Sequence, residues 1–492
     1  MLNPGQIRSL NLRYRLEVLD PDQVTKIHQG ALDILERVGI ATSSDRLLEL
    51  MANHGQQVDF EDKRVRLAPG FVEEKRALAP RHFTLGARDP ELNLELDGKH
   101  GYLSPDGCAP QILDPKTGQR RASTKADLGT VTRLADALPE IGLMWRSVAA
   151  NDTPAVVRSL HEVEIQLANT TKHLQTGSGT DAFNARAIVE MLLAVTGGSE
   201  ALRNRPIFSS NQCILSPLFW DADPLEAFEV YAEAGIPISI ISMAMTSATT
   251  PGTVAGAVVL TIAEILSGLT ILQTMSPGAK AICTAYPATI DLNSGALNLA
   301  AGPDDATAGM ACTQVLRHLG LPCGTGILGT GAKTSNWQAG VQSTLTAVKS
   351  AAMSADVLNG AGGIYGSSVY SPIQLVLDCE VFDIVARWTE ACAIDDEHMA
   401  LDLIEEVGPA GHFLAAPHTL THMRELWRSR FMDTSSWEEW QEAGEPDSTR
   451  AAEAEAKMIL DRHEPDPLPE DIATEIRRIV ERHQAEALEQ EV

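Results

Sequence analysis

The chain has 492 residues, too many for one ordinary domain but suited to a barrel of about 250 residues or more with added segments. Hydrophobic residues make up 44% and charged residues 21%, as in a folded globular protein with a large core. The formal net charge of -27 argues against binding nucleic acid or a membrane surface, because binding their phosphates needs clustered lysine and arginine.

The N-terminal stretch lacks the apolar segment of a secretory signal, and the seven cysteines are scattered without a Cys-x-x-Cys pair. We therefore expect a cytoplasmic protein with reduced thiols. Glu264 is the only charged residue between Glu233 and Lys280, so hydropathy alone would suggest a membrane span there. Prolines and glycines interrupt this stretch, which favours a strand, a loop and a helix instead.

Taken in chain order, residues 1–95 predict an N-terminal α+β cap, with one helix starting after Asp20 and another near 43–54. From about residue 100 strands and helices alternate. The predicted strands are 101–105, 143–149, 172–177, 207–213, 237–243, 280–285, 321–328 and 360–365. The predicted helices are 125–137, 157–169, 181–196, 224–234, 253–273, 304–319, 338–357 and 375–393.

Eight strands, each followed by a helix, predict the α/β fold class and a (β/α)8 TIM barrel over residues 96–393. An open doubly wound sheet is the less favoured alternative, because no Gly-x-Gly-x-x-Gly turn opens the first strand–helix unit. Residues 394–492 are rich in charged residues and tryptophan, and predict a helical C-terminal extension. We expect it to pack around the barrel or to form a subunit contact, as in a homo-oligomer.

In such a barrel the active site lies on the loops that follow the strands. Only 5% of the chain is aromatic, yet aromatic residues recur on these loops, where a ring of them would suit a methylated ammonium ion. We expect Trp220, Tyr286 and Tyr365 to face one cavity, although any single one of them is more simply a loop anchor. The candidate substrate-binding residues are Gln212, Trp220, Tyr286, Asp291, Lys333, Asn336 and Tyr365.

Isolated charges add a few candidates. Lys333 stands alone in a charge-free stretch from Leu319 to Val348, where it could hold a substrate carboxylate or be an ordinary surface lysine. Asp291 is a further pocket candidate. Glu264 lies in the middle of a predicted helix and is more simply a structural partner.

His418 and His422 lie four residues apart, a spacing that puts two imidazoles on one helix face as metal sites require. No third ligand is evident from the sequence, so we predict no metal and favour a packing or docking role for these histidines. A Walker phosphate-binding loop and the Gly-x-Ser-x-Gly motif are absent from the sequence, and no dinucleotide fingerprint opens the first strand–helix unit.

Several long segments resemble one known family. They are MTSATTPGTVAGAVV, GAKTSNWQAGVQSTLTAVKSAAMSADVLNGAGG, VLDCEVFD, GPAGHFLAAPHTLTHMRELW, ILDPKTGQRRASTKADL and DRHEPDPLPEDI. By these segments the chain resembles the trimethylamine methyltransferase superfamily, in its non-pyrrolysine, glycine betaine methyltransferase-like branch. The likeness runs over nearly the whole chain and is more specific for family than for substrate.

The resemblance implies a barrel enzyme that demethylates a methylamine and methylates the cobalt of a separate corrinoid protein. The trimethylamine branch carries pyrrolysine to activate its amine, whereas this sequence has only standard residues, with Lys333 in the loosely corresponding region. A quaternary ammonium leaves as a neutral amine without such activation. The resemblance therefore favours glycine betaine or a related betaine as the substrate.

The corrinoid (cobalamin) is expected on a partner protein rather than tightly bound to this chain. Asp396-Glu-His398-Met-Ala-Leu401 begins like the Asp-x-His-x-x-Gly cobalt-ligand motif but has leucine where glycine belongs. Two alternatives stay open. One is a non-catalytic barrel that binds a betaine or serves assembly, and the other is a barrel lyase that uses Lys333 as a Schiff-base nucleophile.

Overall fold

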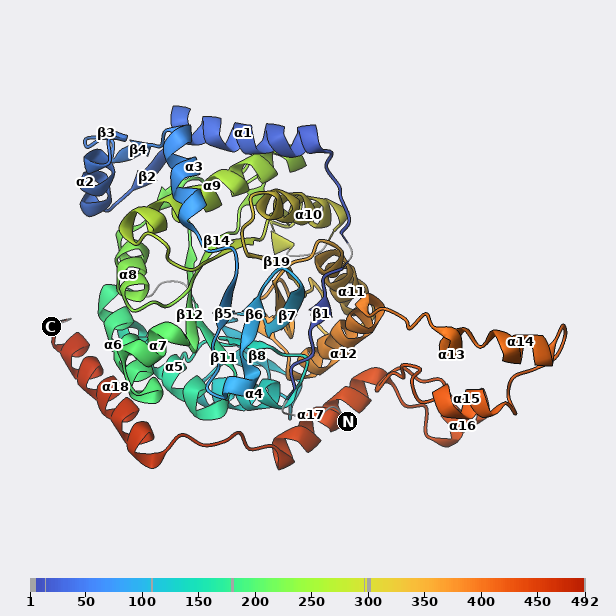
Figure 1. The fold of residues 1–492 in the computed structure, drawn as a ribbon. Helices are drawn as coiled ribbons and strands as arrows, with labels where there is room; N and C mark the ends of the chain where they lie inside the picture. Colours follow the sequence, from blue (N-terminus) through green and yellow to red (C-terminus); the bar gives the residue numbers. More distant parts are fainter. Residues whose placement is uncertain are drawn as a thin grey trace.

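A curled sheet of parallel strands forms the centre of the protein (Figure 1). The computed structural model describes residues 6–13, 15–107, 109–177, 181–295, 297–298 and 302–490. The parallel strands are β7 (His100–Pro105), β10 (Leu143–Trp145), β11 (His173–Thr176), β12 (Phe208–Cys213), β14 (Ile238–Ser242), β16 (Ala281–Ala285), β19 (Cys323–Ile327) and β20 (Val357–Ala361).

These eight strands pair in chain order, and β20 returns to pair with β7. A single parallel bridge from Leu103 to Ile141, just before β10, links the two ends of the series. The Gly142 N–H donates to the Leu103 carbonyl at 2.8 Å beside this bridge. Strand β1 (Leu10–Asn11) adds a ninth, antiparallel strand to β7. The result is a barrel-like α/β sheet.

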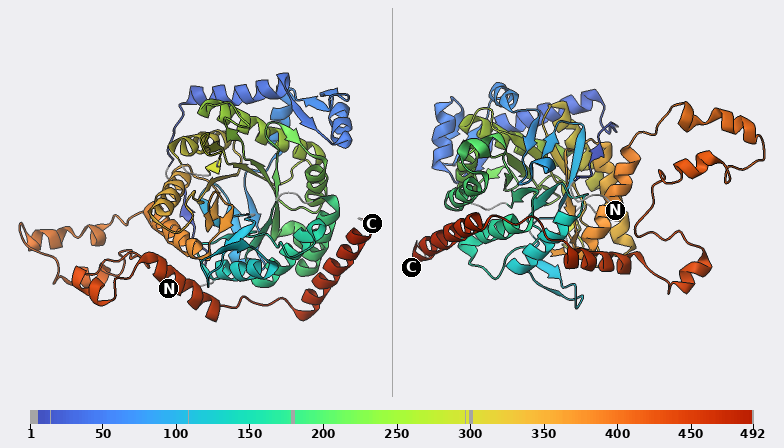
Figure 2. Two further views of the ribbon diagram at one scale, coloured as in Figure 1. Left: turned by 180° about the vertical axis from the view of Figure 1, so that it is seen from behind. Right: turned by 60° about the horizontal axis from the view of Figure 1, so that its bottom comes forward.

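A helix follows each parallel strand and lies outside the sheet (Figures 1 and 2). These helices are α4 (Lys125–Ala137), α5 (Arg158–Asn169), α6 (Ala182–Thr196), α8 (Ala222–Glu233), α9 (Val254–Met275), α10 (Pro303–His318), α11 (Trp337–Ala352) and α12 (Pro372–Thr389). All eight overlap a helix predicted from the sequence. The main strand error is the last one, because β20 starts at Val357 and ends before the glycine-rich turn at Gly362–Gly363.

Helix α9 is the one described helix long and apolar enough to cross a membrane, but 72% of its most apolar window is buried inside the protein. It packs against α10, β14 and β16 on the sheet side. Its single charge, Glu264, accepts hydrogen bonds from the hydroxyls of Ser216 (2.8 Å) and Ser242 (2.6 Å) and from the backbone N–H of Leu218 (3.0 Å). Helix α9 is therefore a core helix, and Glu264 has the predicted structural role.

The N-terminal segment covers one side of the sheet and closes one of its ends. It contains α1 (Pro21–Arg37), β2 (Ile40–Thr42), α2 (Asp45–Asn53), β3 (Gln57–Asp59), β4 (Arg64–Arg66), α3 (Pro69–Leu78), β5 (Phe83–Leu85), a short 3-10 turn (Pro90–Leu92) and β6 (Leu94–Leu96). Helices α1 and α3 pack on α9. Side chains of the β5–β6 hairpin form an apolar cluster with Leu143, Ile282 and Val357 from the first halves of β10, β16 and β20. The amino ends of the strands are thus filled by apolar side chains.

Short elements decorate the loops at the carboxyl ends of the strands. They are β8 (Gln111–Leu113), β9 (Arg120–Ala122), a 3-10 turn (Ala155–Val157), β13 (Phe219–Trp220), β15 (Met245–Thr246), β17 (Ala288–Ile290), β18 (Leu297–Asn298), β21 (Gly363–Ile364) and β22 (Val369–Tyr370). The short helix α7 (Ser199–Asn204) instead connects α6 to the amino end of β12. No disulfide joins the described cysteines, and Cys108 lies outside the described residues.

Beyond α12 the chain leaves the main body as an arm, residues 394–447, that Figures 1 and 2 show projecting outward. The arm carries α13 (Asp396–Met399), α14 (Leu401–Val407), α15 (Pro417–His422) and α16 (Trp437–Glu442). The chain then returns through α17 (Ser448–Arg462), which packs on α4 and α12, and α18 (Glu470–Gln490), which packs on α5 and α6.

Candidate functional site

Polar and aromatic side chains gather inside the sheet at the carboxyl ends of its strands. Successive residues of a strand point to opposite faces, so Ser104 of β7 and Asp106, the residue directly after this strand, share one face. The Ser104 hydroxyl donates to Oδ1 of Asn359 on β20 at 2.8 Å. The amide nitrogen of Asn359 in turn donates to the hydroxyl of Tyr286, which follows β16. Strand β19 lies between β20 and β16, so the hydrogen bond from Asn359 to Tyr286 crosses the interior of the sheet.

An aromatic pair lies next to these hydrogen bonds. The rings of Trp145, at the end of β10, and Tyr286 stack with their centroids 6.5 Å apart and their planes at 25°. Ile241 and Ala288 complete a small buried cluster with them. Faces of aromatic rings attract cations, so this pair is a candidate partner for a soft positive charge.

Asp106 is the acidic residue of this group that could balance the charge of a bound cation. Its side chain is buried, and burial raises the pKa of its carboxyl to about 7, although hydrogen bonds from Ser367 and the Gly107 N–H (2.9 Å) oppose the rise. Burial raises the pKa of Tyr286 well above its usual value, and the nearby Asp106 charge raises it further. Asp106 is therefore within electrostatic reach of the aromatic pair.

Two glycines allow the backbone to pack closely against Trp145 and Asp106. A Cβ at Gly107 would lie 2.4 Å from Cδ2 of Trp145, and a Cβ at Gly363 would lie 1.9 Å from Oδ2 of Asp106.

Asn211 on β12 shares the interior face with Ser209, whose hydroxyl accepts a hydrogen bond from the Gln175 amide and donates one to Nε2 of His173. Both polar atoms of the buried Asn211 amide lack a hydrogen-bond partner among the described residues. Such groups are costly unless something bonds to them.

Two predicted candidates, Lys333 and Tyr365, form a second group nearby. The Lys333 ammonium lies 4.9 Å from the centre of the Tyr365 ring and donates to the Gly331 carbonyl at 2.9 Å. Both side chains are exposed. The loop carrying Lys333 is joined to the Asp106 region, because the Thr330 N–H donates to the Gly363 carbonyl at 3.1 Å.

Trp220 does not join the expected cavity. It is fully buried on the outer side of the sheet, where its indole N–H donates to Ser267 of α9 at 2.9 Å and its ring meets Phe228 edge-on. The reason is that Phe219–Trp220 pairs as β13 with β2 of the N-terminal segment. The expectation that Trp220, Tyr286 and Tyr365 share one cavity was wrong for Trp220.

Gln212 also faces outward. It pairs in register with Ile240, which packs on Gly268 of α9, and its amide donates to Ser210 at 2.8 Å. Its neighbour Asn211 takes the interior position. Asp291 lies in an exposed loop, where its carboxylate accepts from the backbone N–H groups of Asn293 and Ser294, and these bonds lower its pKa.

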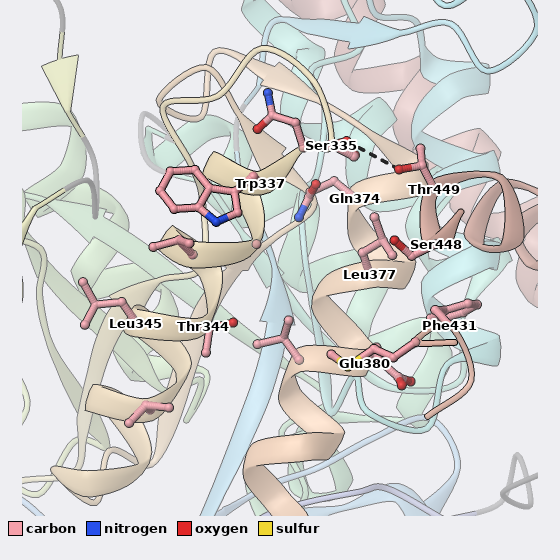
Figure 3. Close-up of a pocket in the computed structure, with 16 residues that line it drawn as sticks. Ser335, Trp337, Thr344, Leu345, Gln374, Leu377, Glu380, Phe431, Ser448 and Thr449 are labelled. Carbon is pink, nitrogen blue, oxygen red and sulfur yellow. Dashed lines mark hydrogen bonds between the residues drawn. The ribbon is translucent and has the colours of Figure 1, made fainter. Parts of the chain in front are cut away.

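Asn336 caps helix α11, because its side chain accepts from the Ala339 N–H at 3.2 Å. It lines a groove of about 810 Å³ outside the sheet, between α11, α12 and the returning chain (Figure 3). Figure 3 shows Trp337, Leu377 and Phe431 along this groove, with Ser335 accepting a hydrogen bond from Thr449. The groove lies apart from the interior polar cluster.

Sequence reasoning missed Asp106, Trp145, Asn211 and Asn359. Asp106 directly follows a predicted strand, and an acidic residue before a glycine at that point is the signal that could have found it. Of the predicted candidates only Tyr286 lies within the interior cluster, whereas Lys333 and Tyr365 form the exposed pair described above.

The buried Asp106 carboxyl generates a prediction about stability. A folded-state pKa raised to about 7 means that the folded protein favours the protonated form, so stability falls as pH rises from about 4 to 7. Asp106→Asn removes the buried charge. It should raise the free energy of unfolding at pH 8, by on the order of 1–4 kcal/mol, and change it little at pH 4. Denaturant unfolding at both pH values measures this, and a variant less stable than the parent at pH 8 would refute the argument.

Comparison with known proteins identifies the family of this chain. The sequence profile of the trimethylamine methyltransferase (MTTB) family matches residues 6–487. A trimethylamine methyltransferase MttB from Desulfitobacterium hafniense is 32% identical over 463 residues, which cover 94% of this chain and 92% of the relative. A glycine betaine methyltransferase from the same species is 32% identical over 469 residues, 95% and 97% of the two chains.

The crystal structure of the monomethylamine methyltransferase from Methanosarcina barkeri shares the fold, with a TM-score of 0.51 and 11% sequence identity. The alignment covers 92% of this chain and 89% of that one. Because the family profile and both bacterial relatives match almost the whole chain, the protein belongs to the trimethylamine methyltransferase (MTTB) family of methyltransferases.

Proposed function

We propose that this protein moves a methyl group from a quaternary amine, glycine betaine or a related betaine, to the cobalt of a corrinoid protein. Family membership supports methyl transfer from a methylated amine. The observation that carries the choice of a cationic substrate is the buried Asp106 carboxyl beside the stacked rings of Trp145 and Tyr286. A carboxylate and aromatic faces together favour a permanent, weakly hydrated cation.

Within this proposal the sheet is a closed (β/α)8 barrel, since the Leu103–Ile141 bridge joins β7 to the start of β10. We further infer a division into an N-terminal cap (1–95), the barrel (96–393) and a C-terminal extension (394–492). The substrate then sits at the carboxyl ends of the strands, opposite the apolar plug formed by β5 and β6. A cytoplasmic location also remains a prediction.

The choice between a tertiary and a quaternary amine rests on chemistry. The two bacterial relatives, named for trimethylamine and for glycine betaine, are equally similar to this chain at 32% identity. The sequence has only the twenty standard residues and so lacks pyrrolysine. A tertiary amine is a poor leaving group without activation, whereas a quaternary ammonium already leaves as a neutral amine. A substrate carrying its own charge fits a site without an activating group.

The chain's own residues would bind and orient rather than exchange protons. Trp145 and Tyr286 would hold the ammonium against their ring faces, and ionised Asp106 would balance its charge. The Asn359 hydrogen bond fixes the Tyr286 hydroxyl, so the ring is held in place before substrate binds. The Asn211 amide faces the same interior and offers a donor and an acceptor that no described residue uses.

The corrinoid supplies a cobalt(I) nucleophile that accepts the methyl group. We propose that it arrives on a partner protein, because the Asp396–Leu401 segment departs from the cobalt-ligand motif at its last position. The partner would approach the carboxyl ends of the strands, where Lys333 and Tyr365 are exposed.

The test is to incubate the purified protein with cob(I)alamin and a panel of methylamines and betaines, and to record the spectrum of the methylated corrinoid. We expect methyl transfer from a quaternary amine and little from trimethylamine. Asp106→Asn should weaken cation binding about tenfold or more, and Trp145→Leu roughly 2–30-fold. Asp291→Asn, in the exposed loop, is the matched control and should leave binding unchanged.

The pH dependence of binding follows from the same group. Only ionised Asp106 attracts the cation, so parent affinity should rise between pH 6 and 8, whereas the Asp106→Asn variant should show no such rise. Efficient turnover of trimethylamine would overturn the quaternary-amine assignment. Tight betaine binding without methyl transfer would favour a non-catalytic binding barrel, and borohydride trapping of a carbonyl compound on Lys333 would favour the lyase.

A further prediction concerns the exposed pair of Lys333 and Tyr365. If the Lys333 ammonium holds the carboxylate of a betaine, Lys333→Ala should weaken glycine betaine binding roughly tenfold. Tetramethylammonium has no carboxylate, so its affinity should stay the same. Calorimetric titration of both ligands separates the effects, and equal losses for the two would remove Lys333 from this role.

We also propose that the protein is a homo-oligomer in which the arm packs against a second copy of the chain. The arm exposes large apolar side chains, among them Ile394, Leu414 and Leu420, each more than 70% exposed. Large exposed apolar side chains gathered on one segment favour an interface, and most soluble oligomers are built from identical chains.

Sedimentation of the parent and of a Leu414→Glu, Leu420→Glu double variant tests this. We expect the parent to sediment as an oligomer and the variant to shift toward the monomer. Leu292→Glu is the control, because Leu292 is equally exposed but lies on a loop of the main body. A monomeric parent at micromolar concentration would contradict the proposal.

A further inference from the structure

The arm lacks a core of its own. None of residues 394–447 is buried, and none of the helices α13 to α16 contains a buried residue. Its longest helix, α14, has seven residues, which is too short for a helix to be stable alone in water. Small segments without a core commonly rely on a metal ion or disulfides to hold their shape.

A cluster of ligand-type side chains joins the two limbs of this arm. His398 lies on the outgoing limb, in α13, whereas His422 ends α15 on the returning limb and Glu425 follows it. One ligand atom from each of the three lies within 4.8 Å of the others. Nδ1 of His422 is 2.9 Å from Oε1 of Glu425, and Nε2 of His398 is 3.9 Å from Oε2.

The surroundings orient His398 as a metal ligand. Its Nδ1 is 2.7 Å from the carboxylate of Asp395, so Nε2 is the nitrogen turned toward Glu425. Metal-bound histidines usually have their second nitrogen bonded to a carboxylate or carbonyl in this way. Glu397 adds a further carboxylate, with Oε1 3.7 Å from Nε2 of His422.

The returning limb is fixed to the main body just after the cluster. The guanidinium of Arg387, near the end of α12, donates to the backbone carbonyl of Glu425 at 3.1 Å. Two residues on, the Trp427 indole N–H donates to Asp383 of α12 at 2.7 Å. A bond between His398 and this limb would therefore tie the outgoing limb to the barrel as well, and would close residues 399–421 into a loop.

We propose that His398, His422 and Glu425 bind a zinc ion that holds the two limbs of the arm together. Two imidazoles and a carboxylate are ligands that zinc accepts, and a water molecule or Glu397 would take the fourth position. The site is independent of methyl transfer, since its residues lie on the projecting arm and the proposed substrate site lies inside the sheet (Figure 1).

From the sequence we predict no metal site, because only His418 and His422 have a ligand-like spacing and no third ligand is evident from the sequence. The His418 and His422 rings do lie side by side, with centroids 4.3 Å apart. However, Nε2 of His418 is 3.0 Å from the backbone oxygen of Glu397, a contact that occupies it. The third ligand needed for a site comes from His398, which lies 24 positions before His422 and could be joined to it only through the fold.

The experiment uses the full chain purified without a histidine tag, stripped with a chelator and then titrated with Zn²⁺. Native mass spectrometry should find one zinc per chain. His398→Ala, His422→Ala and Glu425→Gln should each weaken zinc binding at least about tenfold. His412→Ala is the matched control, because His412 is an exposed histidine of the same arm outside the cluster.

A second readout reports on the role of the metal. Cleavage by a glutamate-specific protease at Glu405 and Glu406, inside the closed loop, should become several-fold faster when zinc is removed, and equally fast in the His398→Ala variant with zinc present. Cleavage rates that do not respond to zinc would overturn the role of the metal in holding the arm. Absence of zinc binding, or binding that is unchanged in all three ligand variants, would show the cluster to be an ion-pair network only and would refute the site.

Discussion

Strand register decides which side chains meet in this protein. Residues of a strand alternate between the interior of the sheet and the helices outside it, so a shift of one residue exchanges the two sets. In β12 this alternation puts Asn211 inside and turns Gln212 toward helix α9. In β14 it puts Ile241 beside Trp145 and turns Ile240 toward α9. The composition of the interior, and with it the chemistry available there, follows from these registers.

The interior is strongly asymmetric along its axis. At the amino ends of the strands the β5–β6 hairpin supplies apolar side chains that fill the space. At the carboxyl ends the buried groups include polar and aromatic side chains, and burial opposes ionisation of the Asp106 carboxyl. A protein gains nothing in stability from such a group, because burying an unpaired charge is costly. A bound ligand of opposite charge would offset this loss of stability. Carboxyl groups with perturbed pKa values are accordingly concentrated at functional sites.

Much of the fold was predictable because its signals are local. Helices α4 and α12 begin after a threonine and a serine whose side chains cap the first turn, and apolar periodicity marks the rest. The site was less predictable because it depends on distant contacts. Trp220 follows a strand, as a site residue should, but the pairing of β13 with β2 holds it outside the sheet. Asp106 directly follows a predicted strand, but its burial near Trp145 and Tyr286 depends on contacts with distant parts of the chain.

The arm is held together by different interactions from those of the barrel. The barrel tolerates buried polar groups in its interior because a continuous apolar core surrounds it. The arm has no such core, and its apolar side chains face outward, so packing within one chain cannot fix its shape. Two kinds of contact remain that can do so: bonds between its two limbs, for which His398, His422 and Glu425 are placed, and contact with another surface, for which Ile394 and Leu414 are exposed. These contacts reinforce each other, because a segment whose limbs are already joined loses less conformational entropy when it docks.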